Sequence, residues 1–310
     1  MHTDSVLDVR KSSKTFGKVR VLNDVSLSIA RGEMVGLIGA SGSGKSTLMR
    51  AIAGLTPIDG AATADEESVI RLFGEPMQRR GSIARAARGL RARVGVIFQQ
   101  FNLVPRLSVL TNVCLGRLGR MPALRAVLGR FTRDDKRGAM RALSRVGIAQ
   151  HALKRGSDLS GGQQQRAAIA RALVQGAEFI VADEPIASLD PSSARRVMDI
   201  LAELNREDGI TVLVSLHQVE YALRYCPRTI ALKDGAIAYD GPSRALTPEF
   251  LGEIYGAEGA DLFASLDLGA AVASRAANDA VPTGSRTPLP AELVALTRQN
   301  GVDLARRLSA

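Results

Sequence analysis

Residues 39–46 carry the stretch that decides the fold, Gly39-Ala40-Ser41-Gly42-Ser43-Gly44-Lys45-Ser46. The apolar residues Met34–Ile38 come directly before it and predict a short buried strand. The residues from Ser46 to Ala53 predict a helix that ends at Gly54. A loop of the pattern G-x-x-x-x-G-K-[ST] between a strand and a helix is typical of sites that hold phosphate groups with backbone N–H groups. The stretch therefore indicates an α/β fold that binds a nucleotide.

Each part of this loop has an expected task at a bound ATP. Glycines let the backbone come close to an anion, and the N-terminus of the following helix favours negative charge. We expect Lys45 to contact the β- and γ-phosphates and the Ser46 hydroxyl to bind Mg²⁺. A chance loop of glycine and serine is the alternative. The predicted ATP-binding residues of the loop are Gly39, Ala40, Ser41, Gly42, Ser43, Gly44, Lys45, Ser46 and Thr47.

Two carboxylates follow a second apolar strand. Residues Phe179–Ala182 predict the strand, and Asp183 and Glu184 come directly after it. We expect Asp183 to hold Mg²⁺, through water, and Glu184 to polarise the attacking water. Successive side chains of a strand point to opposite faces. The two acids can therefore serve different tasks only if the chain turns at the strand end, a turn that the following Pro185 favours.

A second short string predicts another phosphate site. It reads Leu159-Ser160-Gly161-Gly162-Gln163 and precedes a helical stretch that includes residues 166–173. Ser160 is a natural N-cap, and a plain capping loop is the alternative interpretation. A cap does not require two glycines followed by glutamines. We expect Ser160, Gly161, Gly162 and Gln163 to grip the γ-phosphate of an ATP bound to an opposite subunit, which predicts a two-fold dimer with two shared sites.

Together, the three motifs in this order resemble those of the ATP-binding cassette (ABC) ATPases. The resemblance covers roughly residues 5–256 and implies an active ATPase. The resemblance implies that a glutamine contacts Mg²⁺ and the attacking water. We assign this role to Gln99 and not to Gln100, because Gln99 directly follows an expected strand, Val94–Phe98. A pair of surface glutamines is the alternative.

Three further residues acquire expected roles from the same resemblance. Asp190, in Ser188-Leu189-Asp190, matches the D-loop at the dimer interface; the alternative is a helix N-cap before Pro191, which is compatible with that role. His217 ends the expected strand Thr211–Leu216 and matches the switch histidine at the γ-phosphate. Phe16 occupies the position where the family stacks an aromatic ring on adenine, and core packing is the alternative.

The resemblance also implies the architecture. We expect an α/β P-loop NTPase of the ABC ATPase type, with a mostly parallel sheet core, an antiparallel β subdomain and an inserted α-helical subdomain at about residues 101–158. The remaining residues, 257–310, are rich in alanine and proline and predict a linker with one possible helix, Leu293 to Leu308. No function is assigned to this tail.

Composition limits the class of protein. The chain of 310 residues contains no apolar run of about 18, so no membrane span is expected, and its start lacks the pattern of a signal peptide. Its two cysteines favour a reducing, cytoplasmic setting. The formal charge is +10, but no aromatic residue lies within the arginine-rich stretch 79–93. We therefore expect no nucleic acid partner and favour a basic face near a membrane surface.

Within the superfamily the chain resembles the ATP-binding subunits of bacterial phosphonate importers, on the strings at residues 98–113, 116–119, 182–191 and 215–226. The first string is partly shared with amino-acid importers and discriminates weakly. The resemblance implies a homodimer on the cytoplasmic side of the inner membrane, bound peripherally to two permease subunits, with a periplasmic substrate-binding protein acting indirectly. Residues 101–109 are the expected permease contact. The alternatives are an importer of another oxyanion or a polar amino acid, or a soluble ABC-type ATPase outside transport.

Overall fold

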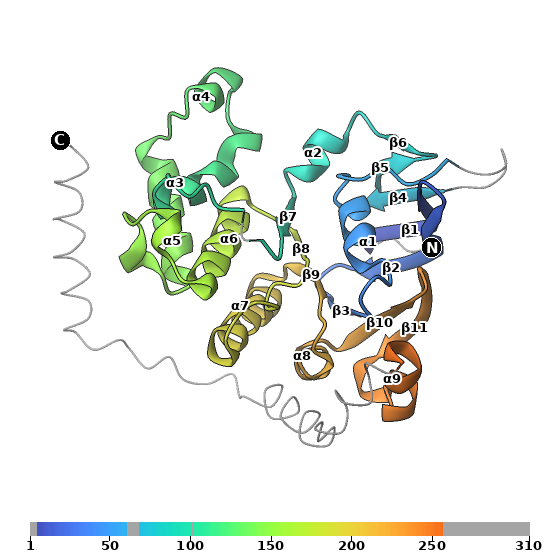
Figure 1. Cartoon of the computed structure of the whole chain (residues 1–310). Helices are drawn as coiled ribbons and strands as arrows, with labels where there is room; N and C mark the ends of the chain where they lie inside the picture. The colour runs from blue at the N-terminus through green and yellow to red at the C-terminus, as the bar shows by residue number, and fades with distance from the viewer. Residues whose placement is uncertain (1–4, 61–67, 101, 257–310) are drawn as a thin grey trace. The chain divides into compact units, whose positions relative to one another are not determined.

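A six-stranded sheet forms the centre of the protein (Figure 1). The structure is a computed structural model that describes residues 5–60, 68–100 and 102–256, all within one structural unit. The strand order is β11 (Ala236–Pro242), β10 (Arg228–Lys233), β3 (Met34–Ile38), β9 (Thr211–Ser215), β8 (Phe179–Ala182) and β7 (Val94–Ile97). Strands β10, β3, β9, β8 and β7 are parallel, and only the edge strand β11 runs antiparallel. This confirms the expected, mostly parallel sheet.

The order of the parallel strands determines where the functional loops meet. Strands β3, β8 and β9 are buried along their whole length, as expected for strands covered on both faces. Their carboxyl ends lie at one edge of the sheet, where ligands of parallel sheets bind. The phosphate loop follows β3, the two acids follow β8, and His217 lies just beyond β9. Gln99 lies beyond β7, which ends at Ile97, one residue earlier than expected.

An antiparallel sheet covers part of one face of this core. Its order is β2 (Val19–Ala30), β1 (Ser5–Phe16), β4 (Val69–Leu72), β5 (Glu75–Arg79) and β6 (Ser82–Ile83). One apolar cluster joins residues of β1 and β2 to helix α1 (Lys45–Ile52) and to inward-facing residues of the parallel sheet, such as Leu37 and Val181. A short helix, α2 (Ala87–Arg91), follows this sheet and was not expected from the sequence.

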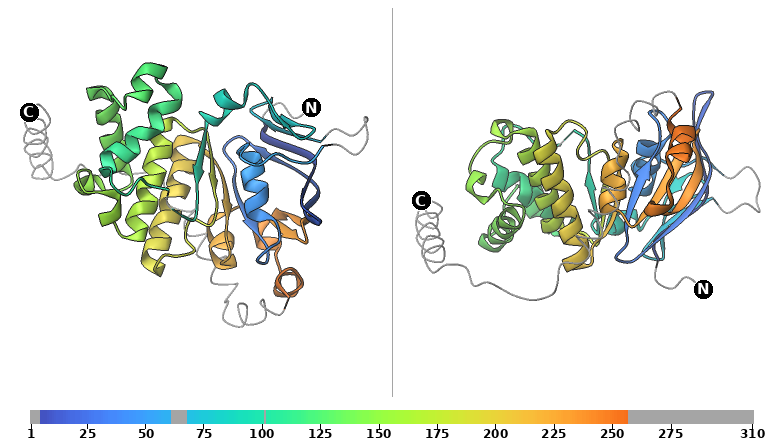
Figure 2. Two further views of the ribbon diagram at one scale, coloured as in Figure 1. Left: turned by 45° about the horizontal axis from the view of Figure 1, so that its top comes forward. Right: turned by 90° about the horizontal axis from the view of Figure 1, so that it is seen from below.

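Helices between β7 and β8 form a separate group (Figure 2). They are α3 (Val109–Cys114), the 3₁₀ segment η1 (Leu115–Arg120), α4 (Ala123–Val127), α5 (Arg133–Arg145), the short 3₁₀ segments η2 (Ala149–His151) and η3 (Gly156–Asp158), and α6 (Gly161–Gln175). Helices α3, α5 and α6 pack on one another, and α6 also packs on β7. Helix α3 changes to the 3₁₀ geometry of η1 at Leu115, where Gly116 brings η1 against the α6 backbone.

A second apolar cluster covers the other face of the parallel sheet. It joins this helical group to α7 (Pro191–Asp208), α8 (Val219–Tyr225) and α9 (Pro248–Tyr255), the last of which follows the 3₁₀ segment η4 (Ser243–Ala245). None of the helices in the described part of the chain is long and apolar enough to cross a bilayer. The expected linker 257–310 and its possible helix lie outside the described residues. The α/β class with a parallel core, an antiparallel sheet and a helical group is confirmed.

Candidate active site

The phosphate loop is held open by three glycines in the left-handed region. Gly39, Gly42 and Gly44 have φ values of 147°, 80° and 102°. A Cβ on Gly39 would lie 2.3 Å from the Leu232 carbonyl oxygen, so only glycine fits this close approach. Gly44 is also the N-cap of α1 and offers no side chain to the first N–H groups of that helix. These N–H groups are therefore available to an anion.

Lys45 is buried at the base of this loop. The residue is only 5% exposed, and its Nζ donates to the carbonyl oxygens of Gly39 at 2.8 Å and Ala40 at 3.0 Å. Burial lowers its pKa, while the nearby Glu184 and Asp183 carboxylates act in the opposite direction. Among the described side chains, the buried Ser43 Oγ has no hydrogen-bond partner. A buried cation, an unpartnered hydroxyl and open N–H groups together fit a bound polyphosphate.

The acid Asp183 connects this loop to the neighbouring strands. It is 6% exposed, and its Oδ1 accepts hydrogen bonds from Ser46 Oγ at 3.0 Å and Ser215 Oγ at 2.9 Å. Hydroxyl and carboxylate oxygens are the ligand types that Mg²⁺ prefers. Ser46 and Asp183 therefore fit a magnesium site, with Ser215 orienting the carboxylate from behind.

The chain turns at Glu184. Such a turn is the condition under which Asp183 and Glu184 can serve different tasks. The φ of Glu184 is 47°, a conformation that costs a non-glycine residue about 1–2 kcal/mol. Its N–H donates to Ser215 Oγ at 2.8 Å, and this contact helps to hold the turn. Ser215 is therefore a site residue that the sequence analysis missed. The available signal was a hydroxyl at the end of an otherwise apolar strand, two residues before His217.

A cavity of about 170 Å³ lies beside the phosphate loop and brings several of these groups together. It is lined by Ser41, Glu184, Ile186, Ala187, Ser215, Leu216, His217 and Gln218. Glu184 and His217 thus share one cavity with a residue of the phosphate loop. A carboxylate and an imidazole on such a space can hold and polarise a water molecule next to a phosphoryl group.

Phe16 and Gln99 lie outside this cavity's lining. Phe16 ends β1 and is 50% exposed, so its ring is presented to solvent and core packing does not explain it. The Lys14 ammonium lies 5.2 Å from the centre of its ring. Gln99 is exposed two residues after β7. Their roles at adenine and at Mg²⁺ stay predictions.

The second string caps α6. Ser160 Oγ accepts from Gln163 N–H at 3.4 Å, and Gln163 Oε1 accepts from Ser160 N–H at 3.1 Å, which is a capping box. Gly162 allows α6 to approach α7 closely, because a Cβ there would lie 2.7 Å from the Ser193 side chain. Ser160 is exposed and does not line the cavity beside the phosphate loop of its own chain. The capping interpretation is correct, and it leaves the exposed face of the string available to a second subunit.

Asp190 caps the neighbouring helix α7. Its carboxylate accepts the N–H groups of Ser192 and Ser193, both at 3.0 Å, as well as the Ser192 hydroxyl. These hydrogen bonds, led by those of the serine side chains, hold the Asp190 pKa well below its usual range. The expected N-cap is confirmed, and the interface role stays a prediction.

Comparison with known proteins identifies this arrangement. The family model described as "ABC transporter" matches residues 22–187, which include the phosphate loop, the Ser160 string and both acids. The chain belongs to the ABC transporter family. Its fold is that of a P-loop ABC ATPase, as the ordered motifs predicted.

Individual relatives of this ABC chain cover most of its length. The "Phosphonates import ATP-binding protein PhnC" of Caulobacter vibrioides is 55% identical over 85% of this chain and 98% of its own length. The "Phosphonates import ATP-binding protein PhnC 1" of Pseudomonas aeruginosa is 59% identical over 82% of this chain and 90% of its own. Among solved structures, the dimeric bacterial ABC transporter cassette MJ0796 is 32% identical, with a TM-score of 0.66, and is matched over its full length and 77% of this chain.

Proposed function

We propose that this chain is the ATP-hydrolysing subunit of an ABC importer that takes up phosphonates. In the overall reaction, ATP and water become ADP and phosphate while a phosphonate moves from outside to inside. The observation that carries the proposal is the relationship above: proteins named for phosphonate import share 55% and 59% identity with this chain over more than four-fifths of its length. The intact phosphate loop and acid pair support an active ATPase.

The residues of the site divide the work of hydrolysis. The phosphate loop, residues 39–47, and its Lys45 ammonium would hold the phosphates, while the exposed Phe16 ring would stack on adenine. Ser46 and Asp183 would hold Mg²⁺, assisted by Gln99, and a bound Mg²⁺ neutralises charge on the phosphates. Glu184 would accept the proton of the attacking water, and His217, across the same cavity, would contact the γ-phosphate.

The string at Ser160 supports a two-fold homodimer. One chain offers one phosphate loop and one such string, and the string does not line the cavity of its own chain. In a face-to-face dimer each string would complete the partner's site, with Asp190 nearby. ATP then closes the dimer because it binds the closed state more tightly, and hydrolysis lets it open.

Transport requires partners that this chain does not contain. We propose two permease subunits, with a periplasmic substrate-binding protein that acts on the permease and not on this chain. The chain would be peripheral, on the cytoplasmic side of the inner membrane. The loop after Gln99 is the proposed permease contact; residues 102–109 of it are described, while Phe101 lies outside the described residues. No nucleic acid partner is proposed.

The test is ATP turnover by the chain reconstituted with the permease pair and the binding protein of a phosphonate importer from the same organism. We expect 2-aminoethylphosphonate to stimulate turnover, and Glu184→Gln to abolish the stimulated rate. Inorganic phosphate and a polar amino acid serve as competing substrates. Stimulation by one of these alone would contradict phosphonate uptake but keep the transport role. Failure to bind any permease would contradict the transport role and favour a soluble ATPase.

A further inference from the structure

The last residue of helix α9 contacts the first residue of the phosphate loop. Tyr255 Oη accepts a hydrogen bond from Gly39 N–H at 3.2 Å, across 216 residues of sequence. Tyr255 is 3% exposed and packs in the apolar cluster together with Leu251 and Ile254. Figure 1 shows α9 beside β10. In the sequence, α9 is distant from the phosphate loop that Tyr255 contacts. The motifs identified in the sequence do not include this tyrosine.

Gly39 also contacts Lys45, the lysine proposed to bind the phosphates. Its carbonyl oxygen accepts Lys45 Nζ at 2.8 Å. Its φ of 147° and the close approach to Leu232 leave the backbone little room to move. The N–H of Gly39 is thus held by Tyr255 while its carbonyl holds Lys45. A loss of the first contact would leave a buried N–H unpaired and would favour a shift of the residue on which Lys45 rests.

The ring of Tyr255 has a second neighbour at the site. Its centre lies 6.3 Å from that of the His217 ring, with the planes at 68°, an edge-on arrangement. His217 lines the cavity that it shares with Glu184. The same side chain therefore contacts the phosphate loop through its hydroxyl and the switch histidine through its ring.

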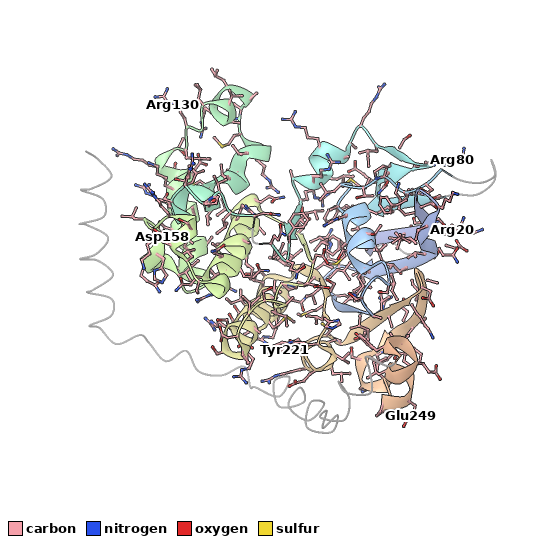
Figure 3. All side chains as sticks on the ribbon, in the orientation of Figure 1. Arg20, Arg80, Arg130, Asp158, Tyr221 and Glu249 are labelled. Carbon is pink, nitrogen blue, oxygen red and sulfur yellow. The ribbon has the colours of Figure 1, made fainter. Side chains whose placement is uncertain are left out.

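The hydroxyl acts here as a neutral hydrogen-bonding group. Burial raises the pKa of Tyr255 to about 12, so the phenol does not ionise in the physiological range. The helix that carries it is well anchored at its start, where Thr247 Oγ1 caps the Phe250 N–H. Glu249, on the same helix, points outward to solvent (Figure 3). One end of α9 thus faces solvent while the other end reaches the site.

We infer that Tyr255 is a positioning residue for ATP hydrolysis: its hydroxyl fixes Gly39, and thereby Lys45, while its ring restricts His217. The inference rests on the ATP site proposed above. A purely structural role is the competing explanation, because Tyr255 also fills space in the apolar cluster. Two consequences distinguish a positioning role from a purely structural one. If Tyr255 positions the site, loss of its hydroxyl should weaken nucleotide affinity, and loss of its ring should slow turnover.

The first experiment compares Tyr255→Phe with Tyr225→Phe. Each change removes one hydroxyl from a buried tyrosine; that of Tyr225 donates to Asp199 on α7 and does not touch the loop. We expect Tyr255→Phe to raise the Kd of a fluorescent ADP analogue and the KM for ATP about three- to tenfold. Tyr225→Phe should leave both constants within twofold. Equal nucleotide affinity in the two variants would overturn the inference.

The second experiment tests the ring. The kcat of Tyr255→Leu should be at least threefold lower than that of Tyr255→Phe. When each of the two substitutions is made separately in a His217→Ala background, their kcat values should be equal. A threefold difference that persists in that background would remove His217 from the inference. If the leucine variant does not fold, the phenylalanine comparison decides alone. A wild-type chain without ATPase activity would contradict the proposed function. The contact of Tyr255 with Gly39 could still be tested, because nucleotide affinity can be measured without turnover.

Discussion

Ser46 Oγ donates to Asp183 Oδ1 at 3.0 Å, across 137 residues of sequence. Ser46 lies in the first turn of α1 after β3, and Asp183 follows β8. Strand β9 lies between those two strands and supplies Ser215, whose hydroxyl donates to the same carboxylate oxygen. The strand order β3-β9-β8 thus brings together the two residues proposed to bind Mg²⁺ and the serine that orients the carboxylate.

This pair predicts a specific effect of neutralising the acid. Asp183→Asn keeps the shape of the side chain and one oxygen that can accept from Ser46 and Ser215, but removes the charge that would bind Mg²⁺. We expect half-maximal ATPase activity to require roughly 10- to 100-fold more Mg²⁺, the order of loss seen when a metal site is perturbed. A magnesium titration of turnover measures this, with EDTA abolishing activity in the wild type. An unchanged magnesium requirement would remove Asp183 from the metal site.

The turn at Glu184 predicts separate effects on binding and turnover. Glu184→Gln should retain ATP affinity and lower turnover by about 10²–10⁴-fold, the usual contribution of a general base. Because ATP then persists, the variant should accumulate as a closed dimer in size-exclusion chromatography with ATP. Turnover at the wild-type rate would show that another group activates the water.

Because Ser160 is exposed, a substitution there should impair dimer formation and leave nucleotide binding by the monomer unchanged. Ser160→Arg places a bulky cation on the face proposed to meet the partner's ATP. We expect the monomer to bind nucleotide normally, whereas the ATP-dependent dimer of the Glu184→Gln background no longer forms. Ser144→Arg, at an exposed position of α5, is the matched control. A dimer that persists in the Ser160 variant would contradict the shared-site arrangement.

Two nearby glycines predict different effects on stability. A Cβ at Gly116 would lie 2.3 Å from the Arg171 carbonyl oxygen, whereas one at Gly119 would meet only Ala92 Cβ at 3.6 Å. Gly116→Ala should therefore lower the unfolding free energy by about 1–3 kcal/mol, through overpacking of η1 against α6. Gly119→Ala should stay within about 0.5 kcal/mol of the wild type. Chemical denaturation of both variants measures the difference, and equal stabilities would contradict the close packing.

The described cassette predicts that the tail is dispensable for hydrolysis. All the predicted site residues lie between Phe16 and His217, and the additional contact Tyr255 precedes residue 257. Removal of residues 257–310 should leave the basal ATPase rate within about twofold of the full chain. Circular dichroism of the shortened chain controls for folding. A collapse of folding or activity would show that the tail belongs to the cassette.

Much of this protein could be predicted from local sequence. Apolar runs marked β3 and β8 with their observed bounds. Capping, the alternative interpretation of Ser160 and of Asp190, is correct for both, because a cap depends on residues only two or three positions away. The phosphate loop was likewise complete within one stretch. Prediction was weaker where the backbone depends on packing. Within the expected helical subdomain, the chain changes to 3₁₀ geometry at Leu115, beside the close contact between η1 and α6.

The sequence by itself determined the family and the strands that end at the site, and it predicted a role for each loop, because these follow from short-range patterns. Only the tertiary structure decided which loops meet. Strands β3, β9 and β8 are neighbours in the sheet although they lie far apart in the chain, and this order brings Ser215 to Asp183. Packing of α9 likewise brings Tyr255 to Gly39. The tyrosine has no local signature, and the only local signal of the serine is its place at the polar end of an apolar strand. Both are ordinary residues until distant parts of the chain pack against them.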